Sequence, residues 1–122
     1  MVQYLQFDSR LGTIEPFDFA SSNVPPVCLL RVQDVVLVDC DSADSQDVFV
    51  YYDIQGTDMA SNGQKFTQWP YTKVTFASPQ VDYECANWLR DEIQKALEMT
   101  DGPSILTVTS IPPILITQVA AW

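Results

Sequence analysis

Apolar residues recur every three or four positions between Ser78 and Gly102, and this spacing predicts an amphipathic α-helix. Ser78 suits the N-cap, and Pro79 suits the first helical position, where a missing N–H costs nothing. Gly102, which readily adopts positive φ, and Pro103 are expected to end the helix. The predicted apolar stripe consists of Val81, Cys85, Trp88, Leu89, Ile93, Ala96 and Leu97. The opposite, polar face consists of Asp82, Asn87, Asp91, Gln94, Lys95 and Glu98.

Runs of β-branched and aromatic residues predict strands on both sides of this helix. Residues 27–39 read as a long strand with a break near Gln33 and Asp34, and the four apolar residues 35–38 favour burial on both faces. Residues 56–70 contain several turn formers and predict a longer loop, with Phe66 and Trp69 packed back on the domain. Further strands are expected at residues 48–54 and 73–77, and a closing pair at 105–109 and 114–119, separated by two prolines.

Residues 1–26 combine helix and strand breakers with many large apolar side chains, which predicts an extended N-terminal arm. The arm either covers its own domain or lies on another chain, and we expect the second arrangement. The apolar residues of the arm and of the C-terminus are then the candidate interface: Tyr4, Leu5, Phe7, Leu11, Ile14, Phe17, Phe19 and Trp122.

The order of these elements predicts an α+β fold. We expect an antiparallel or mixed β-sheet of about five to six strands packed on one long α-helix. The extended arm is expected at residues 1–26, and a single α+β domain at residues 27–122. One helix covers only one face of such a sheet, so self-association is the simplest way to cover the other face.

Charge narrows the possible partners. Six Lys and Arg residues stand against sixteen Asp and Glu, which gives a formal net charge of −10. An acidic protein is repelled by nucleic acid and by anionic membranes, so we expect neither as a direct partner. No signal peptide and no membrane-spanning run is visible, and assembly in a cytoplasm is expected.

The residue types present argue against an enzyme. The chain contains no histidine, which excludes Ser-His-Asp and Cys-His catalysis and most transition-metal sites. Its glycines are scattered rather than gathered in a phosphate-binding loop. Cys28, Cys40 and Cys85 form no Cys-x-x-Cys pair, so we expect reduced, mostly buried thiols. We expect no cofactor and no small-molecule substrate.

Four aspartates at the junction between the predicted strands 27–39 and 48–54 form the sharpest local feature. Asp39, Asp41, Asp44 and Asp47 are the candidate calcium ligands, because hard cations bind several carboxylate oxygens on a loop. The EF-hand pattern is not met, since Ala43 and Asp44 occupy its fifth and sixth positions. We favour a solvated hairpin turn, in which aspartate and serine are common.

The order of segments resembles that of small virion proteins of tailed, possibly marine, bacteriophages. The residues that carry this likeness are the apolar run 35–38, the acidic loop, residues 48–52, residues 73–77, the helix and the closing strands. The resemblance implies a capsid decoration or minor structural protein, located in the virion and bound to copies of itself or to other virion proteins. The alternatives are a small acidic inhibitor or DNA mimic acting on a host factor, and a calcium-dependent binding module.

Overall fold

The computed structural model describes residues 1–7, 15–16, 28–53, 56–59, 65–68 and 71–121. The strands are β1 (Tyr4–Phe7), β2 (Glu15–Pro16), β3 (Cys28–Arg31), β4 (Val35–Asp39), β5 (Asp47–Tyr52), β6 (Gly56–Met59), β7 (Lys65–Gln68), β8 (Tyr71–Phe76), β9 (Ile105–Thr107) and β10 (Ile116–Ala121). The helix α1 (Glu84–Glu98) lies between β8 and β9 in the chain. The predicted α+β class is therefore confirmed.

The described strands form a three-stranded sheet, a five-stranded sheet and a separate two-stranded ribbon. The small sheet has the order β3-β1-β9, in which β1 is antiparallel to β3 and parallel to β9. The large sheet has the order β2-β10-β8-β5-β4 and is antiparallel except between β10 and β2. The expected single sheet and its closing strand pair were wrong, because β9 joins β1 whereas β10 joins β8.

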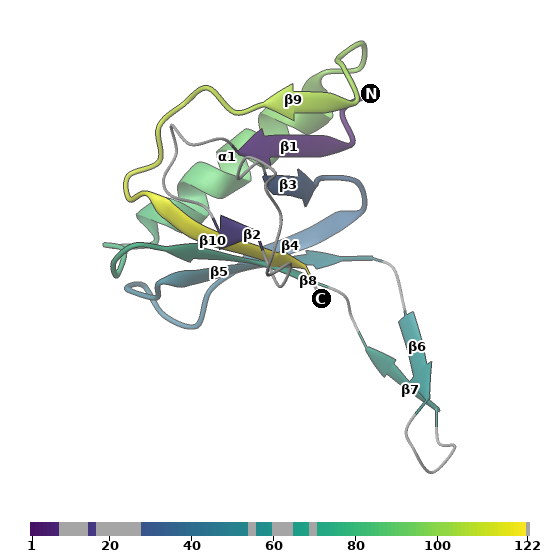
Figure 1. Ribbon diagram of the computed structural model, residues 1–122, viewed down its shortest axis with the longest axis horizontal. Coiled ribbons are helices and arrows are strands. Elements are labelled where there is room, and N and C mark those ends of the chain that lie inside the picture. The colour runs from purple at the N-terminus through teal and green to yellow at the C-terminus, as the bar shows by residue number, and fades with distance from the viewer. Residues whose placement is uncertain (8–14, 17–27, 54–55, 60–64, 69–70, 122) are drawn as a thin grey trace.

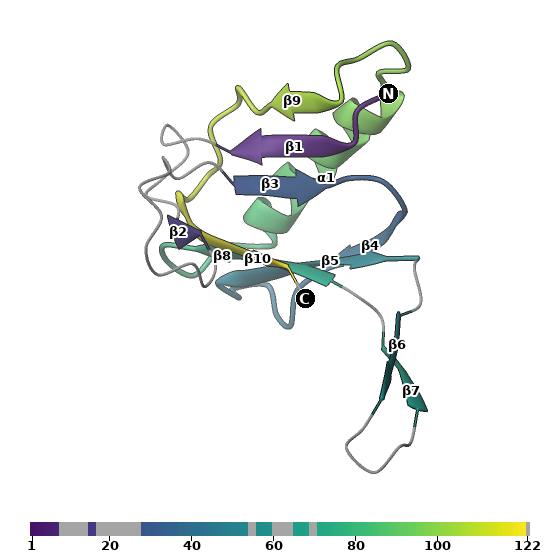
Figure 2. The same cartoon turned by 45° about the vertical axis from the view of Figure 1, so that its right-hand side comes forward.

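The helix covers one face of the large sheet and lies alongside the small sheet (Figures 1 and 2). The core fills the space between these three elements. Leu5, Phe7 and Leu30 enter it from the small sheet, Val48, Val50, Val74 and Phe76 from the large sheet, and Leu89 and Ile93 from α1. Each large apolar side chain buried in this way contributes about 1.5–3 kcal/mol before the entropy cost of ordering the chain.

The first strand corrects the prediction of an arm that starts at Met1. β1 is the central strand of the small sheet, and Val2, Leu5 and Phe7 are fully buried in the core of their own domain. β2 also pairs with the same domain, beside β10. The described part of residues 1–26 thus covers its own chain, and the domain boundary expected at residue 27 was wrong for residues 1–7.

The start of α1 also differs from the prediction. Asp82 and Tyr83 adopt left-handed backbone conformations, with φ of 48° and 60°, so the helix begins at Glu84 rather than at Pro79. Ser78 is exposed and does not cap it. The cap is the buried side chain of Gln80, whose Oε1 accepts hydrogen bonds from the backbone N–H groups of Cys85 and Ala86 at 3.0 and 3.2 Å. The Gln80 side chain, which precedes the helix, thus binds two backbone N–H groups that have no carbonyl partner within the first turn of α1.

The apolar stripe of α1 is largely confirmed. Cys85, Leu89, Ile93 and Ala96 are buried, and Trp88 is partly buried against the core. Two members were placed wrongly: Val81 precedes the helix and is 64% exposed, and Leu97 is 48% exposed near the helix end. The six residues expected on the polar face are all exposed.

Gly102 does not end the helix by positive φ, as expected from the sequence. The helix ends at Glu98 with Met99 as the C-cap. A Cβ atom on Gly102 would lie 2.9 Å from Cγ2 of Val2 and 3.1 Å from Cβ of Met99. Glycine is required here because the N-terminal residues approach the backbone closely, which a side chain would prevent.

Residues 56–59 and 65–68 pair as an antiparallel ribbon instead of forming the expected irregular loop. This ribbon, β6–β7, joins β5 to β8 and projects away from the rest of the molecule in both views (Figures 1 and 2). The side chains of Phe66 and Trp69, which we expected to pack on the domain, lie outside the described part of the structure.

Candidate functional site

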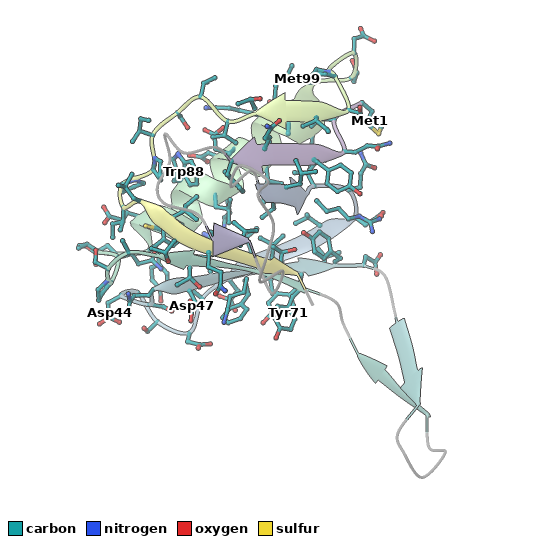
Figure 3. The ribbon with its side chains drawn as sticks, in the orientation of Figure 1. Met1, Asp44, Asp47, Tyr71, Trp88 and Met99 are labelled. Carbon is teal, nitrogen blue, oxygen red and sulfur yellow. The ribbon has the colours of Figure 1, made fainter. Side chains whose placement is uncertain are left out.

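Alternation along β5 and β8 divides their side chains between two faces of the large sheet. Val48, Val50 and Tyr52 are buried toward α1, together with Thr72, Val74 and Phe76. The intervening residues are only half-buried and face the other way: Asp47, Phe49, Tyr51, Tyr71, Lys73 and Thr75. We call this second surface, with its extension onto β4, the outer face. In Figure 3 Tyr71 and Asp47 lie on the side of the large sheet away from α1.

Three aromatic rings gather on the outer face. The centroids of Phe49 and Tyr71 are 5.6 Å apart in an edge-to-face arrangement, and Tyr51 lies 5.9 Å from Tyr71 and 6.2 Å from Phe49. The strand register accounts for this cluster, since Tyr51 and Tyr71 are paired residues and Phe49 lies two positions before Tyr51 in β5, on the same face. Aromatic pairs at these distances stabilise a sheet by roughly 0.5–1.5 kcal/mol each.

The edge strand β4 extends the apolar part of the outer face. Val36 is 57% exposed and Leu37 is 50% exposed, so the expected burial of residues 35–38 on both faces was wrong. Among the described strands β4 pairs with β5 alone, and a register irregularity between Val35 and Leu37 leaves Val36 exposed. An open hollow of about 360 Å³ lies here, lined by Val36, Leu37, Asp39 and Tyr51.

Acidic groups border the hollow. Asp39 lines it, and Asp41 follows in the exposed connection to β5. The pKa of Tyr51 is raised mainly by burial and then by the negative charges of Asp39 and Asp41. Lys73 is the basic residue of the face on β8. The outer face therefore has aromatic rings in its middle, on β5 and β8, and acidic residues where β4 ends.

The free edge of β4 is partly closed by the helix. Arg90 of α1 donates hydrogen bonds from Nη2 and Nε to the carbonyl oxygen of Val38, at 2.8 and 3.3 Å. A charged side chain on an edge carbonyl hinders the addition of another strand.

The four candidate calcium ligands are not brought together. Oδ1 of Asp39 accepts a hydrogen bond from the N–H of Cys40, Oδ1 of Asp44 from Ser42, and Oδ1 of Asp47 from Thr75. Asp41 is exposed. Across the residues that the structure describes, no group of three Asp, Glu, His or Cys side chains could hold a metal ion. Three of these carboxylates are instead used in local turns and in a contact with β8.

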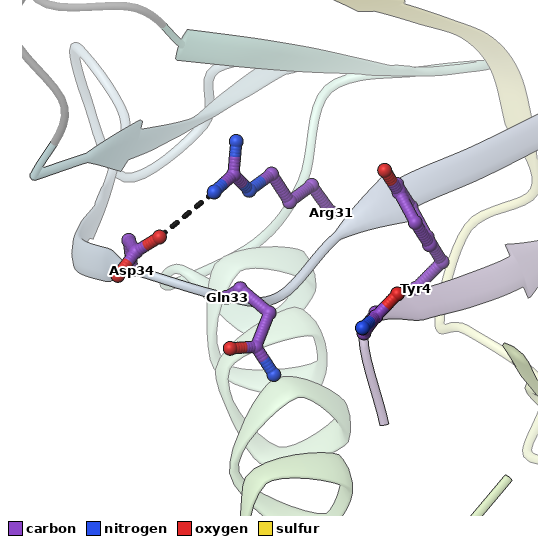
Figure 4. A pocket seen from close by; sticks show the side chains of 5 residues that line it. Tyr4, Arg31, Gln33 and Asp34 are labelled. Carbon is purple, nitrogen blue, oxygen red and sulfur yellow. Dashed lines mark hydrogen bonds and ion pairs between the residues drawn. The ribbon is translucent and has the colours of Figure 1, made fainter. Parts of the chain in front are cut away.

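The predicted interface residues fall into three groups. The predicted interface role was wrong for Leu5 and Phe7, because both are buried in the core of their own domain. Tyr4 is 37% exposed on the small sheet and lines a second hollow of about 360 Å³ with Gln3, Arg31, Gln33 and Asp34 (Figure 4). Arg31 and Asp34 form an ion pair at 2.8 Å beside this hollow. Leu11, Ile14, Phe17, Phe19 and Trp122 lie outside the described residues.

One buried carboxylate joins α1 to the connection between β9 and β10. Oε1 of Glu92 accepts hydrogen bonds from Oγ of Ser110 at 2.5 Å and from Nζ of Lys95 at 3.2 Å. Oγ of Ser110 in turn accepts one from Nε1 of Trp88 at 3.0 Å. These bonds satisfy the polar atoms of Glu92 and Trp88 where they contact the core, and they hold the β9–β10 connection on the helix.

Cys40 and Cys85 are both free and buried, as expected from the sequence. Burial, with a smaller contribution from Glu84, raises the pKa of the Cys85 thiol to about 11. The pKa of Cys40 is raised by burial and then by Asp39. Both thiols are thus protonated at neutral pH, which suits a packing role better than a reactive one.

Comparisons of the chain with protein-family models, with curated proteins and with solved structures found no match. In the described part of the chain, no helix has the length and apolar character needed to cross a membrane.

The sequence analysis did not identify the outer face. All five residues from Val48 to Tyr52 are apolar or aromatic, so alternation of residue type does not show which of them point outward. The sequence does indicate an outward-facing side for β8, because Lys73 and Thr75 alternate with Val74 and Phe76. Pairing β8 with β5 would have placed Phe49 on the same face as Lys73.

Proposed function

We propose that this chain is a non-enzymatic structural component of a bacteriophage virion, and that it binds other proteins through its outer face. The single observation that supports this role most directly is the outer face itself. Phe49, Tyr51 and Tyr71 cluster there beside the exposed Val36 and Leu37. In Figures 1 and 2 no described helix or second sheet covers this side. Exposed apolar patches next to polar residues are typical of protein interaction sites.

The isolated ribbon β6–β7 supports the same role. Its strands pair with each other and with no other described strand. A two-stranded ribbon is marginally stable by itself in water, so contact with a partner would stabilise it. It leaves the domain where β5 ends and β8 begins, next to Tyr51 and Tyr71. The ribbon and the outer face can thus contact one partner together.

A test of this proposal is incorporation of variants into the virion. Particles of the virus that encodes the chain would be purified and probed with antibodies against it. Leu37→Ser should reduce incorporation, whereas Leu115→Ser should not. Leu115 is a matched control, because it is 48% exposed and lies beside Ala77, at the far end of β8 from Tyr71. Absence of the wild-type chain from purified particles would overturn the virion role.

A small acidic inhibitor is the second candidate, favoured by the distribution of carboxylates. Asp91 and Glu98 are exposed on one side of α1, and Asp82 is exposed just before it. The N–H of Tyr83 binds the carbonyl oxygen of Ala43 at 3.1 Å, which joins this side to the loop of Asp41 and Asp44. Competition of the chain with duplex DNA for a basic DNA-binding protein, reduced in an Asp91→Asn, Glu98→Gln variant, would favour this candidate.

A further inference from the structure

We propose that the outer face binds an extended segment of a different protein, in which an apolar residue at position i is followed by a lysine or arginine at position i+2. This inference rests on the proposed binding function and specifies the chemistry of the partner. It follows from the shape of the hollow, from the charges around it and from the spacing between the two.

The hollow supplies the apolar part of the site. Val36, Leu37 and Tyr51 line it, and both β4 residues are at least half-exposed. Its volume of about 360 Å³ lies at the lower end of the range for ligand pockets, about 300–1,000 Å³. An aliphatic side chain placed there would remove the exposed surface of Val36 and Leu37 from water.

The charge of the site selects a basic partner. Asp39 lines the same hollow, and Asp41 is exposed two residues further along the chain. A second copy of the chain would bring the same carboxylates and a formal charge of −10 to the interface. Like charges facing each other disfavour association, whereas a basic partner gains affinity and association rate. Charge complementarity therefore favours a different, basic protein over self-association through this face.

The spacing of the two features favours an extended segment. Leu37 pairs with Tyr51, and Asp39 pairs with Phe49 two positions further on, so the apolar pair Leu37–Tyr51 lies next to the pair that carries the Asp39 carboxylate. Side chains at i and i+2 of an extended chain point to the same side, about 7 Å apart. A segment lying along β4 and β5 would place an apolar side chain over Leu37 and a basic one over Asp39.

The probe for this inference is a fluorescein-labelled peptide of sequence Leu-Thr-Lys-Thr-Leu-Thr-Lys-Thr, compared with one in which Glu replaces Lys. Binding to the full chain is measured by fluorescence anisotropy at low and at physiological salt. We expect the Lys peptide to bind roughly tenfold or more tightly than the Glu peptide, and its affinity to fall with added salt.

Two pairs of variants separate the site from general attraction to an acidic protein. Leu37→Ser and Asp39→Asn should each weaken binding of the Lys peptide by roughly fivefold or more, corresponding to about 1 kcal/mol. Leu115→Ser and Asp91→Asn, which remove the same groups elsewhere, should leave binding within about twofold. Equal losses at Asp39 and Asp91, or no binding of the Lys peptide, would overturn the inference.

Light scattering on the full chain without a partner distinguishes this inference from the proposed function. A dimer that Leu37→Ser dissociates and Leu115→Ser does not would show that a second copy occupies the outer face. That result would overturn the basic-partner inference while supporting a binding role for the face. A monomer at high protein concentration agrees with the inference.

Discussion

Nε2 of Gln80 donates a hydrogen bond to the carbonyl oxygen of Ser45 at 2.8 Å, and this bond connects the acidic β4–β5 loop to the start of the helix. The same side chain caps α1 through its Oε1 atom. One residue thus fixes the loop that follows Asp39 relative to α1. The position of the acidic border of the outer face depends on this contact.

Replacing Gln80 should be strongly destabilising. Gln80→Ala leaves the N–H groups of Cys85 and Ala86 and the carbonyl of Ser45 without this partner inside the domain. We expect a loss of roughly 2–3 kcal/mol in the free energy of unfolding, measured by urea denaturation. Ser78→Ala, at the cap position expected from the sequence, should change stability by no more than about 0.5 kcal/mol. The opposite ranking of the two variants would contradict the cap described here.

The two leucines of α1 should differ sharply. Leu89 is fully buried and Leu97 is 48% exposed. Leu89→Ala should cost about 2–5 kcal/mol because it leaves a cavity in the core, whereas Leu97→Ala should cost less than about 1 kcal/mol. Thermal melts of both variants followed by circular dichroism compare them directly. An unchanged melting temperature for Leu89→Ala would mean that the buried side of the helix is assigned wrongly.

Stability should fall in alkaline solution. The pKa of the Cys85 thiol in the folded chain, about 11, lies above its ordinary value of 9.0, so the folded state keeps a proton that the unfolded state releases. The resulting stabilisation is complete below pH 9.0 and is lost as the pH rises toward about 11. The pKa of Tyr52 is raised in the same direction, mainly by burial.

Urea denaturation as a function of pH tests this assignment. The free energy of unfolding of the wild-type chain should decrease between about pH 9 and pH 11, and Cys85→Ala should decrease less steeply. Near neutral pH the two proteins should differ by a constant offset from the lost packing. Identical slopes in the alkaline range would show that Cys85 is not the group responsible.

Calcium should leave the protein unchanged. Asp39, Asp44 and Asp47 each accept a hydrogen bond from a different neighbour instead of converging on one point. Millimolar Ca²⁺ should therefore produce no rise in melting temperature relative to a chelator control, since an ion bound to the native state would stabilise it by mass action. A calcium-dependent rise that is absent in an Asp41→Asn, Asp44→Asn variant would contradict this description.

Much of the helix could be predicted from the sequence, because three- and four-residue spacing fixes one buried stripe wherever the helix starts. Its first turn could not be predicted. The sequence does not reveal the left-handed conformations at Asp82 and Tyr83, and Gln80 caps the helix from the irregular segment before it, where its side chain also binds the carbonyl oxygen of Ser45. Local propensity favoured Ser78 and Pro79, and packing of the loop at Ser45 overrode it.

The outer face could not be predicted from the sequence for a related reason. A continuous apolar run such as residues 35–38 is typical of a strand buried on both faces, yet the same run forms an exposed edge here. The difference depends on strand order, which no local pattern contains. β1 shows the converse: Leu5 and Phe7 resemble a detached apolar arm, although long-range pairing places them in the centre of the small sheet.

The most direct test of the proposed binding role of the outer face is hydroxyl-radical footprinting of the tyrosines, in the free chain and in particles of the bacteriophage that the proposed function implies. Tyr51 and Tyr71 lie on the outer face, whereas Tyr83 is 44% exposed beside the start of α1 and serves as the internal control. The proposed role predicts that assembly protects Tyr51 and Tyr71 severalfold more than Tyr83. Equal labelling of Tyr51 and Tyr71 in the free and assembled states would contradict it.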